Sequence, residues 1–394
     1  MSQATAVVFG AGSVGRGFLG QLFSESGYEV VFVDVDAPLV AALAARGSYK
    51  LRLSGVVKVE ELTIGPVRAV DGRDVAAVVK EVARASLMAT AVGARALAAI
   101  AKPIAQGLAV RWAAENTVPL NVILCENLHD APEQLHTAIQ ANLPETLWTA
   151  LDARVGLVPA VIARMSPVPT PEQRAEDPTL IVAEPYKVIP VDREAFVGAI
   201  PQVVGMVAVA PFEAYTARKL FIHNAAHALL GYLGFQRGHT FGYEALDDPW
   251  ILERVQGALE ESARALMGAY GFEAVAMREH LDYMLTRFAN RALADPVDRL
   301  ARDPLRKLAP GDRLVGAARL AEAHGIRPEW LAWGIAAALA YDNPEDEHSV
   351  RLQAQVRERG VAGALRDVCG IEPAESLGSL VLERFAAPMA GRDG

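Results

Sequence analysis

A glycine-rich turn between two β-rich runs opens the chain, and it constrains the fold more than any other feature. Residues 4–10 (ATAVVFG) and 28–36 (YEVVFVDVD) have the composition of strands, whereas residues 10–27 between them have helical spacing. Two strands joined through a helix form a βαβ unit, which is the building block of parallel sheets. The sequence therefore predicts an α/β fold that begins with a mostly parallel sheet.

The turn has the spacing G-x-G-x-x-G. In such a turn the first glycine allows a tight bend, the second lets the backbone approach a pyrophosphate, and the third lets the helix pack on the strand. Glycines also punctuate ordinary βα turns, but here the motif directly follows a strand and opens a helix whose N-terminus would face phosphates. We expect a dinucleotide to bind the residues of this turn, Gly10, Ala11, Gly12, Ser13, Val14 and Gly15.

Asp34 ends the second β-rich run, about twenty residues beyond the glycine turn, where a carboxylate can accept a hydrogen bond from the adenosine ribose. The same carboxylate would repel a 2′-phosphate, and no arginine directly follows it. The sequence therefore favours NAD over NADP, with Asp36 as the alternative ribose contact.

Further strands are expected at residues 86–92 and 121–126, with Ala-rich helices between and after them. Ligands of parallel sheets bind beyond the carboxyl ends of the strands, so we expect Val92, Gly93, Glu126 and Asn127 to line the cofactor crevice. An asparagine at the end of a strand is also a common turn or cap residue. Residues 50–64 alternate like an antiparallel excursion, and residues 180–192 resemble a late strand that returns to the sheet.

The length of 394 residues favours two domains with a cleft between them. We expect a Rossmann-type, NAD-binding domain over residues 1–195 and an all-helical substrate and catalytic domain over residues 196–394. In the second half, residues 247–271 have a helix pattern with an Asp248 cap and a Gly271 stop. The apolar stretch 330–341 is shorter than the roughly 20 residues of a membrane span and predicts a buried helix.

Charge and cysteine content argue against some classes of protein, namely nucleic-acid-binding and disulfide-stabilised proteins. The formal net charge is -9 with no basic stripe, which argues against nucleic acid as a partner. Two cysteines cannot build a disulfide framework, and the first residues lack the pattern of a signal peptide. We expect a cytoplasmic protein that does not associate with membranes.

One later segment, RKLFIHNAAH at 218–227, combines a lysine, an asparagine and a histidine in a mostly apolar helical run. If residues 213–233 form one helix, Lys219, Asn224 and His227 lie at about 0°, 140° and 80° around its axis. Burial lowers the pKa of a lysine, so that its amine becomes a usable general base. Donors from Asn and His can stabilise the alkoxide that develops during alcohol oxidation.

Two other interpretations of this helix are open. Lys219 can extend along the helix edge to solvent while Asn224 and His227 make structural hydrogen bonds. Alternatively, His223 and His227 have the i, i+4 spacing of zinc ligands, but no carboxylate lies between them and no nearby acid supplies a third ligand. We therefore expect no metal.

Four motifs in order resemble the polyol-specific long-chain dehydrogenases over essentially the whole chain. They are GAGSVGRGF near the start, CEN at 125–127, K-x4-N-x2-H at 219–227 and DPLRKLAPGDRL at 303–314. The lysine motif in a helix after an N-terminal dinucleotide fingerprint is specific to that superfamily. The resemblance implies a metal-independent, NAD-dependent oxidoreductase, and within the family it is strongest to the branch that interconverts mannitol 1-phosphate and fructose 6-phosphate.

The resemblance also implies roles for single residues. Lys219 would be the general acid/base, Asn127 and Asn224 would bond the reacting oxygen, and His227 would orient substrate and lysine. Cations would anchor a sugar phosphate; the candidates are Arg306, Lys307, Arg313 and Arg164. A solvated surface turn is an equal alternative for Lys307 and Arg313.

The chain departs from the family along part of its expected substrate wall. Residues 158–164 read VPAVIAR, so Pro159 and Ala163 replace two acids of the family and only Arg164 is kept, and residues 183–191 lack a tryptophan. A non-phosphorylated polyol or a uronate is therefore an alternative substrate, and a non-catalytic NAD-binding regulator is a remote alternative function. The sequence is compatible with a monomer or a dimer.

Overall fold

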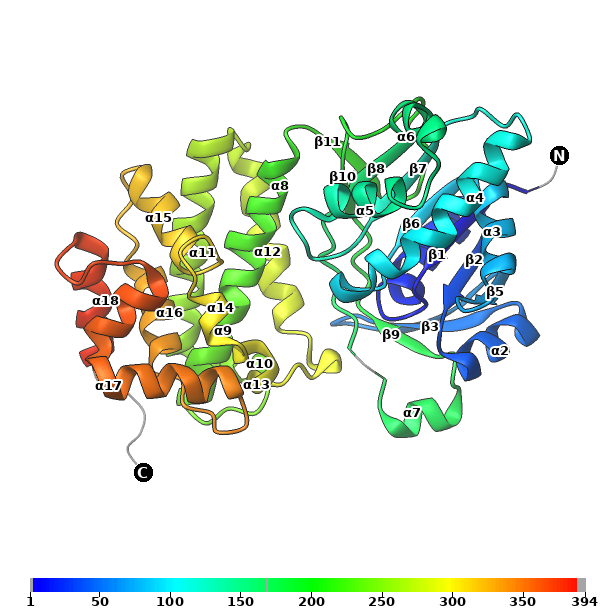
Figure 1. The fold of residues 1–394 in the computed structure, drawn as a ribbon. Coiled ribbons are helices and arrows are strands. Elements are labelled where there is room, and N and C mark those ends of the chain that lie inside the picture. Colours follow the sequence, from blue (N-terminus) through cyan, green and yellow to red (C-terminus); the bar gives the residue numbers. More distant parts are fainter. Residues whose placement is uncertain (1–2, 168, 388–394) are drawn as a thin grey trace. The chain divides into compact units, whose positions relative to one another are not determined.

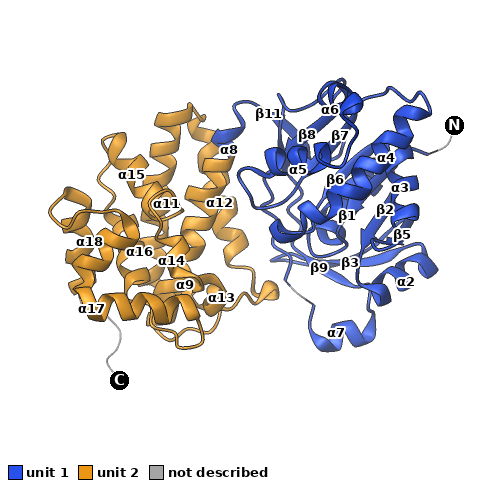
Figure 2. Cartoon of the chain, viewed as in Figure 1, with its two compact units in different colours: residues 1–215 blue, residues 216–394 orange. Residues whose placement is uncertain are grey.

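The computed structural model describes residues 3–167 and 169–387 and divides the chain into two compact units, Met1–Tyr215 and Thr216–Gly394 (Figure 2). This division lies later than the expected domain boundary at residue 195. The reason is that β11 (Met206–Val209) pairs with β10 (Ile189–Asp192), which keeps the intervening segment in the first unit.

The first unit is built on a six-stranded parallel sheet with the order β5-β2-β1-β6-β7-β8 (Figure 1). Its strands are β1 (Thr5–Phe9), β2 (Glu29–Asp34), β5 (Val67–Asp71), β6 (Leu87–Thr90), β7 (Leu120–Leu124) and β8 (Val155–Pro159). From β1 the chain adds β2 and β5 on one side, and it then crosses over to add β6, β7 and β8 on the other side. The point between β1 and β6 is therefore a topological switch point, where open α/β sheets bind ligands. The expected Rossmann-type parallel sheet is confirmed.

Both faces of this sheet are buried, which explains the continuous apolar runs of its strands. Val7 and Phe9 of β1 belong to one core with side chains of α3 (Val75–Arg84), α4 (Ala101–Ala113) and α5 (Ala131–Gln140). Ala6 and Val8 point to the opposite core, which includes residues of α1 (Gly20–Glu25) and α2 (Ala37–Arg46). Helices α3 and α4 lie side by side on their face of the sheet (Figure 1).

The expected antiparallel excursion is confirmed as β3 (Tyr49–Ser54) paired with β4 (Val59–Ile64). The expectation of one returning strand at 180–192 is wrong, because this segment forms two strands that belong to different sheets. β9 (Ile181–Ala183) extends the excursion parallel to β3, and the chain then leaves strand conformation around Pro185 before β10 begins. The other elements of this unit are η1 (Gly15–Leu19), η2 (Ala94–Ala96), η3 (Ala98–Ile100), η4 (Glu145–Leu147), α6 (Trp148–Arg154) and α7 (Pro171–Glu176).

Helices joined by loops make up residues 216–387 of the second unit, as expected. The helical run that leads into it comprises α8 (Phe212–Arg218), η5 (Lys219–Asn224) and α9 (Ala225–Gln236). The others are α10 (Gly242–Asp247), α11 (Pro249–Tyr270), α12 (Ala274–Phe288), η6 (Arg291–Leu293), α13 (Val297–Ala301), α14 (Pro304–Lys307), α15 (Val315–Ala323), α16 (Glu329–Leu339), α17 (Glu347–Cys369) and α18 (Ser376–Ala386). Asp248 accepts from the N–H of Trp250 to cap α11, and Gly271 ends it in the left-handed conformation, so this expected helix is confirmed with both its signals.

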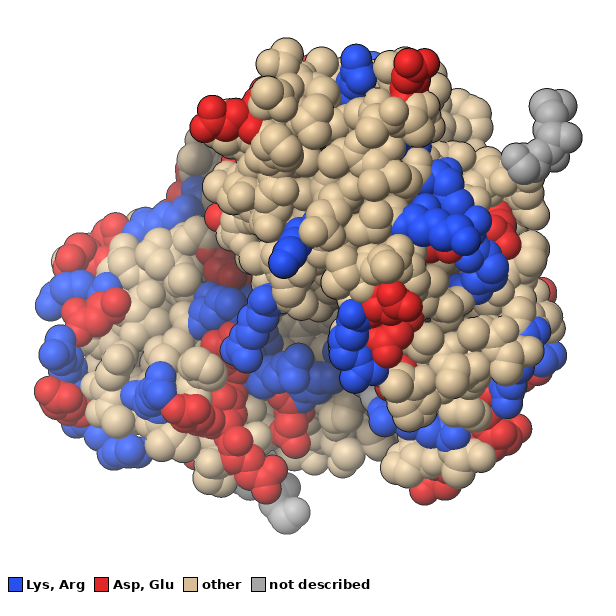
Figure 3. All heavy atoms as spheres, turned by 45° about the vertical axis from the view of Figure 1, so that its right-hand side comes forward, with Lys and Arg blue, Asp and Glu red and all other residues tan. Residues whose placement is uncertain are grey.

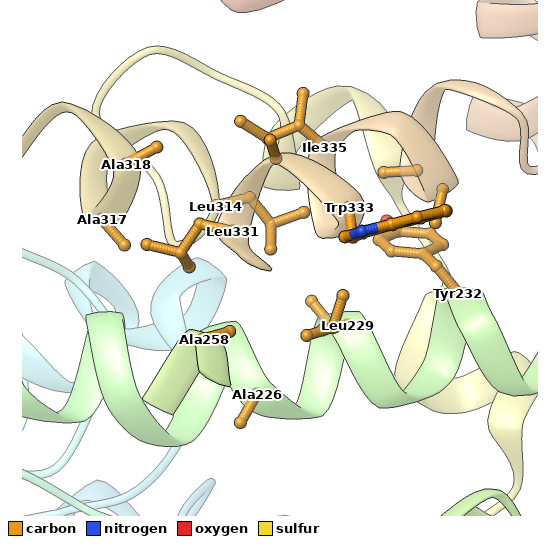
Figure 4. Packing of buried hydrophobic residues seen from close by; sticks show 14 of the residues in the cluster. Ala226, Leu229, Tyr232, Ala258, Leu314, Ala317, Ala318, Leu331, Trp333 and Ile335 are labelled. Atoms are coloured by element: carbon orange, nitrogen blue, oxygen red, sulfur yellow. The ribbon is translucent and has the colours of Figure 1, made fainter. Parts of the chain in front are cut away.

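The core of the second unit fixes α9, which carries the end of the lysine motif. Leu229 and Tyr232 of α9 point toward Leu331 and Trp333 of α16 (Figure 4). Helix α16 covers the apolar stretch that the sequence predicts as a buried helix, and its residues 331–339 are all buried. Because α9 is held on this core, the side chains at its N-terminal end have a rigid support.

Acidic and basic side chains are interspersed over the face shown in Figure 3. Within residues 3–167 and 169–387, no helix is both long enough and apolar enough to cross a bilayer.

Candidate active site

The glycine turn forms directly after β1, and each of its glycines meets a different steric demand. Gly10 has φ +96°, and a Cβ there would lie 2.4 Å from the carbonyl oxygen of Ala91. A Cβ on Gly15 would lie 1.9 Å from the carbonyl oxygen of Gly10. Gly12 differs, because a Cβ there would meet no protein atom within 4 Å. The turn therefore leaves its second glycine exposed, where a pyrophosphate could approach the backbone.

Asp34 is bound to this turn. Its Oδ2 accepts a hydrogen bond from the backbone N–H of Ala11 at 2.6 Å, and its Oδ1 accepts from the N–H of Asp36 at 3.0 Å. The carboxylate of Asp36 is instead the N-cap of α2, where it accepts from the N–H of Leu39 at 3.1 Å. The bond to Ala11 places the Asp34 carboxylate beside the glycine turn, which favours Asp34 over Asp36 as the ribose contact, and the open turn with its adjacent acid fits a dinucleotide.

Arg16 stabilises the glycine turn through a hydrogen bond to its backbone, a role that the sequence analysis missed. Its buried guanidinium donates to the carbonyl oxygens of Ala11 and Thr179, and its own carbonyl accepts from the hydroxyl of Tyr49 at 2.6 Å. Burial lowers the pKa of Arg16, and the charge of the nearby Asp34 opposes this shift. The position of Arg16 directly after Gly15 could have indicated a role at the turn, but nothing in the sequence predicts that Thr179 lies beside Arg16.

The carboxyl ends of β6 and β7 are joined through Glu126. Its buried carboxylate accepts from the hydroxyl of Thr90 at 2.5 Å and from the N–H of Val92 at 3.1 Å. Glu126 therefore shapes the crevice by holding Val92, which leads into the exposed Gly93, rather than by presenting its own oxygens to a ligand. Asn127 follows as an exposed residue at the same edge of the sheet.

A π-helical turn carries Lys219 and Asn224, whereas the sequence analysis assumed a regular α-helix through this segment. The N–H of Ala225 donates to the carbonyl of Leu220, five residues earlier. An i→i+5 turn is wider than an α-turn, so each residue rotates by less than 100° about the axis. The angles of about 140° and 80° expected for Asn224 and His227 relative to Lys219 therefore both decrease. The turn brings the three side chains closer to one line along the helix.

Lys219 has the ionisation that acid/base chemistry needs. Burial, and to a smaller extent the positive charge of Arg313, together lower the pKa of its ammonium to about 8. The start of α15, just after Arg313, packs against the π-helical turn, since a Cβ on Gly316 would lie 2.9 Å from the ring of Phe221. At neutral pH both protonation states of Lys219 are accessible.

His227 lies one turn beyond Asn224, and its ring lies against that of Phe288, with centroids 4.1 Å apart and the planes tilted by 32°. Burial and then the charge of Arg287 keep the pKa of His227 well below its usual range, so the imidazole is neutral. His223 is buried beside it, 4.4 Å between ring centroids, and its Nδ1 lies 3.1 Å from the sulfur of Met284. In the part of the chain that the structure describes, no group of three or more His, Cys, Asp or Glu side chains is arranged as a metal site.

The cations of the 303–314 segment divide into an exposed arginine and two buried groups. Arg306 is exposed and pairs with Asp303 at 2.7 Å. Lys307 is buried and donates to the carbonyl of Leu300, and burial lowers its pKa to about 7. Arg313 is buried and pairs with Asp312 at 2.7 Å. Arg306 is thus exposed to solvent, whereas the charge of the buried Arg313 contributes to the lowered pKa of Lys219.

Arg164 lies inside the first unit. Its Nε donates to the carbonyl of Glu184 at 2.6 Å, its Nη1 donates to Gln21 at 2.8 Å, and its guanidinium lies 5.4 Å from the centroid of the Phe18 ring. These bonds tie β9 to α1, so they favour a structural role over substrate binding.

Comparison with known proteins identifies the family. Residues 4–205 match the mannitol dehydrogenase Rossmann domain, and residues 211–368 match the mannitol dehydrogenase C-terminal domain. The chain belongs to the mannitol dehydrogenase family. The resemblance to polyol-specific long-chain dehydrogenases is thereby confirmed, and with it membership of an oxidoreductase family.

Curated members of the mannitol dehydrogenase family are similar over almost the full chain. The mannitol-1-phosphate 5-dehydrogenase of Bacillus licheniformis is 40% identical over 383 residues, which cover 97% of this chain and 100% of the relative. That of Bacillus subtilis is 38% identical over 381 residues, covering 96% and 99%. The similarity therefore includes both units.

Two solved structures share the fold. Pseudomonas fluorescens mannitol 2-dehydrogenase, in a ternary complex with NAD and D-mannitol, has a TM-score of 0.73 at 18% identity and covers 98% of this chain and 90% of its own. A D-sorbitol dehydrogenase in substrate-free form has a TM-score of 0.79 at 16% identity, with coverage of 97% and 92%.

Proposed function

We propose that the protein is an NAD-dependent dehydrogenase that interconverts mannitol 1-phosphate and fructose 6-phosphate, or a close polyol phosphate. The observation that carries this proposal is the 40% identity to a mannitol-1-phosphate 5-dehydrogenase along 97% of the chain. The partly buried Lys219 on its π-helical turn supports it, because such an amine supplies the base that alcohol oxidation requires. The two buried, unbridged cysteines suit a reducing cytoplasm.

The residues of the first unit would hold the cofactor. The exposed backbone of Gly12 and the helix that starts at Gly15 would receive the pyrophosphate, and Asp34 would accept from the ribose. Arg16 and Glu126 would keep the glycine turn and the Val92 backbone in place around it. When bound, NAD supplies the acceptor of the hydride.

The residues of the second unit would handle the proton and the developing charge. In oxidation the uncharged amine of Lys219 would take the hydroxyl proton, and in reduction its ammonium would return it. The amide of Asn224 and the neutral imidazole of His227 would donate hydrogen bonds to the alkoxide, and Asn127 of the first unit is a further candidate donor. Arg306 would bind the phosphate, since its exposed guanidinium can exchange Asp303 for a dianion.

The test is oxidation of NADH, followed at 340 nm, with fructose 6-phosphate, fructose and a uronate as separate substrates. We expect turnover with fructose 6-phosphate, a loss confined to phosphorylated substrates in Arg306→Ala, and loss of turnover with retained NADH binding in Lys219→Ala. Faster turnover of fructose or the uronate than of the phosphate would favour the alternative substrates. Tight NADH binding without turnover of any substrate would favour the regulator.

A further inference from the structure

A charged pair, Asp71 and Arg73, lies next to Asp34 at the carboxyl edge of the sheet. Strands β2 and β5 run parallel, and their register places Asp71 opposite Asp34. Neighbouring strands lie about 4.8 Å apart. The N–H of Gly72 donates to the carbonyl of Asp34 at 2.9 Å, which fixes the loop after β5 to the end of β2.

Asp71 binds Arg73, the cation of this loop. Its carboxylate accepts from Nε of Arg73 at 2.9 Å, from Nη2 at 2.7 Å and from the backbone N–H at 2.9 Å. The arginine side chain is 62% exposed, so this pair rather than packing orients it. The hydrogen bonds from Arg73 lower the pKa of Asp71 to about 2, so the pair is ionised at neutral pH.

This pair bears on the choice between NAD and NADP. NADP carries a phosphate on the ribose hydroxyl that the acid at the end of the second strand accepts from, and an arginine beside that acid can accommodate it. The chain has such an arginine on the neighbouring loop, but a carboxylate holds it in a bidentate pair. We propose that Asp71 keeps Arg73 neutralised and that Asp34 and Asp71 together restrict the cofactor to NAD. This inference rests on the proposed function and deepens it.

A matched control separates release of Arg73 from the simple loss of a negative charge. Asp74 lies on the same loop and caps α3 by accepting from the N–H of Ala77 at 3.0 Å. Asp74→Asn removes one negative charge from this edge, keeps an oxygen for the cap, and leaves the pair of Asp71 and Arg73 in place.

The test measures the affinities of the full chain for NADH and NADPH by nicotinamide fluorescence, which requires no turnover. In an Asp34→Asn background, Asp71→Asn should strengthen NADPH binding by about tenfold or more, because Arg73 then forms charge-assisted bonds to the phosphate. Asp74→Asn should change NADPH affinity by at most about threefold. Adding Arg73→Gln to the Asp71 variant should remove the gain, and Asp71→Ser should repeat the result of Asp71→Asn.

The outcomes that overturn the proposal are specific. Equal gains from Asp71→Asn and Asp74→Asn, or a gain that survives Arg73→Gln, would show that only the summed charge matters. A wild-type chain that binds NADPH as tightly as NADH would also overturn it. Failure of the wild type to bind either nucleotide would instead contradict the proposed function.

Discussion

The backbone N–H of Ala11 donates to Oδ2 of Asp34 at 2.6 Å. A single carboxylate thus connects the end of β2 to the glycine turn after β1. The acid that we propose as the ribose contact therefore also helps to set the conformation of the glycine turn.

Replacing Asp34 should weaken cofactor binding. Asp34→Ala loses the acceptor for both the ribose and the Ala11 N–H, and hydrogen bonds to charged groups contribute about 1.5–3 kcal/mol. We expect the dissociation constant of NADH to rise by about tenfold or more in a fluorescence titration. Asp36→Asn is the control, because it keeps an acceptor for the N–H of Leu39 at the cap of α2. A larger loss in Asp36→Asn than in Asp34→Ala would assign the ribose contact to Asp36.

Alanine at Gly12 should mainly weaken NADH binding, whereas alanine at Gly15 should mainly destabilise the fold. Gly12→Ala adds a methyl group where no protein atom lies within 4 Å, so the thermal midpoint should remain near that of the wild type while NADH affinity falls. Gly15→Ala places its Cβ 1.9 Å from the carbonyl oxygen of Gly10 and should lower the thermal midpoint. Calorimetry and NADH titration of both variants check this pair, and normal NADH affinity in Gly12→Ala would contradict it.

The first unit was predictable from the sequence because its signals are local. Continuous apolar runs, which form strands buried on both faces, and a glycine turn between two of them indicate the parallel sheet and the place of Asp34. The return at 180–192 was not predictable in the same way. Its break near Pro185 separates β9, which pairs with the distant β3, from β10, which pairs with the following strand β11, and periodicity does not reveal the partner of a strand.

The sequence also left parts of the candidate site undetermined. The K-x4-N-x2-H spacing identified Lys219, Asn224 and His227, but one extra residue per turn in a π-helix does not change residue types, so the wider turn was not visible. The basic segment did not reveal which cations are exposed. The structure separates Arg306, on the surface, from Lys307 and Arg313, which are buried.

The pH dependence of turnover should report the ionisation of Lys219. Oxidation needs the uncharged amine, so kcat for the polyol should rise with pH and level off above a pKa near 8. Reduction needs the ammonium and should fall through the same range. Lys219→Met should lose about 10²–10⁴-fold in kcat and also this pH step. A step of the same midpoint in the residual activity of Lys219→Met would assign the titration to another group.

Removing the charge of Arg313 should move that step. The arginine lowers the pKa of Lys219, so Arg313→Gln should shift the midpoint of the oxidation profile to higher pH. Arg306→Gln is the control, because this exposed guanidinium is paired with Asp303 and is not among the groups that set the pKa of Lys219. Equal midpoints for wild type and Arg313→Gln would show that burial alone sets the pKa.

Lys219 should also lower the stability of the fold at neutral pH. Its folded pKa of about 8 lies below the ordinary lysine pKa of 10.5, so the unfolded chain binds more protons between these values and the unfolding free energy rises with pH there. The cost is therefore fully present below about pH 8. Lys219→Met removes it and should stabilise the second unit by about 1–3 kcal/mol at pH 7. The gain should shrink as the pH rises toward 10. Urea unfolding of both proteins at pH 7 and 9.5 measures the difference, and a gain that does not depend on pH would show that packing of the methionine, rather than relief of a buried charge, is its cause.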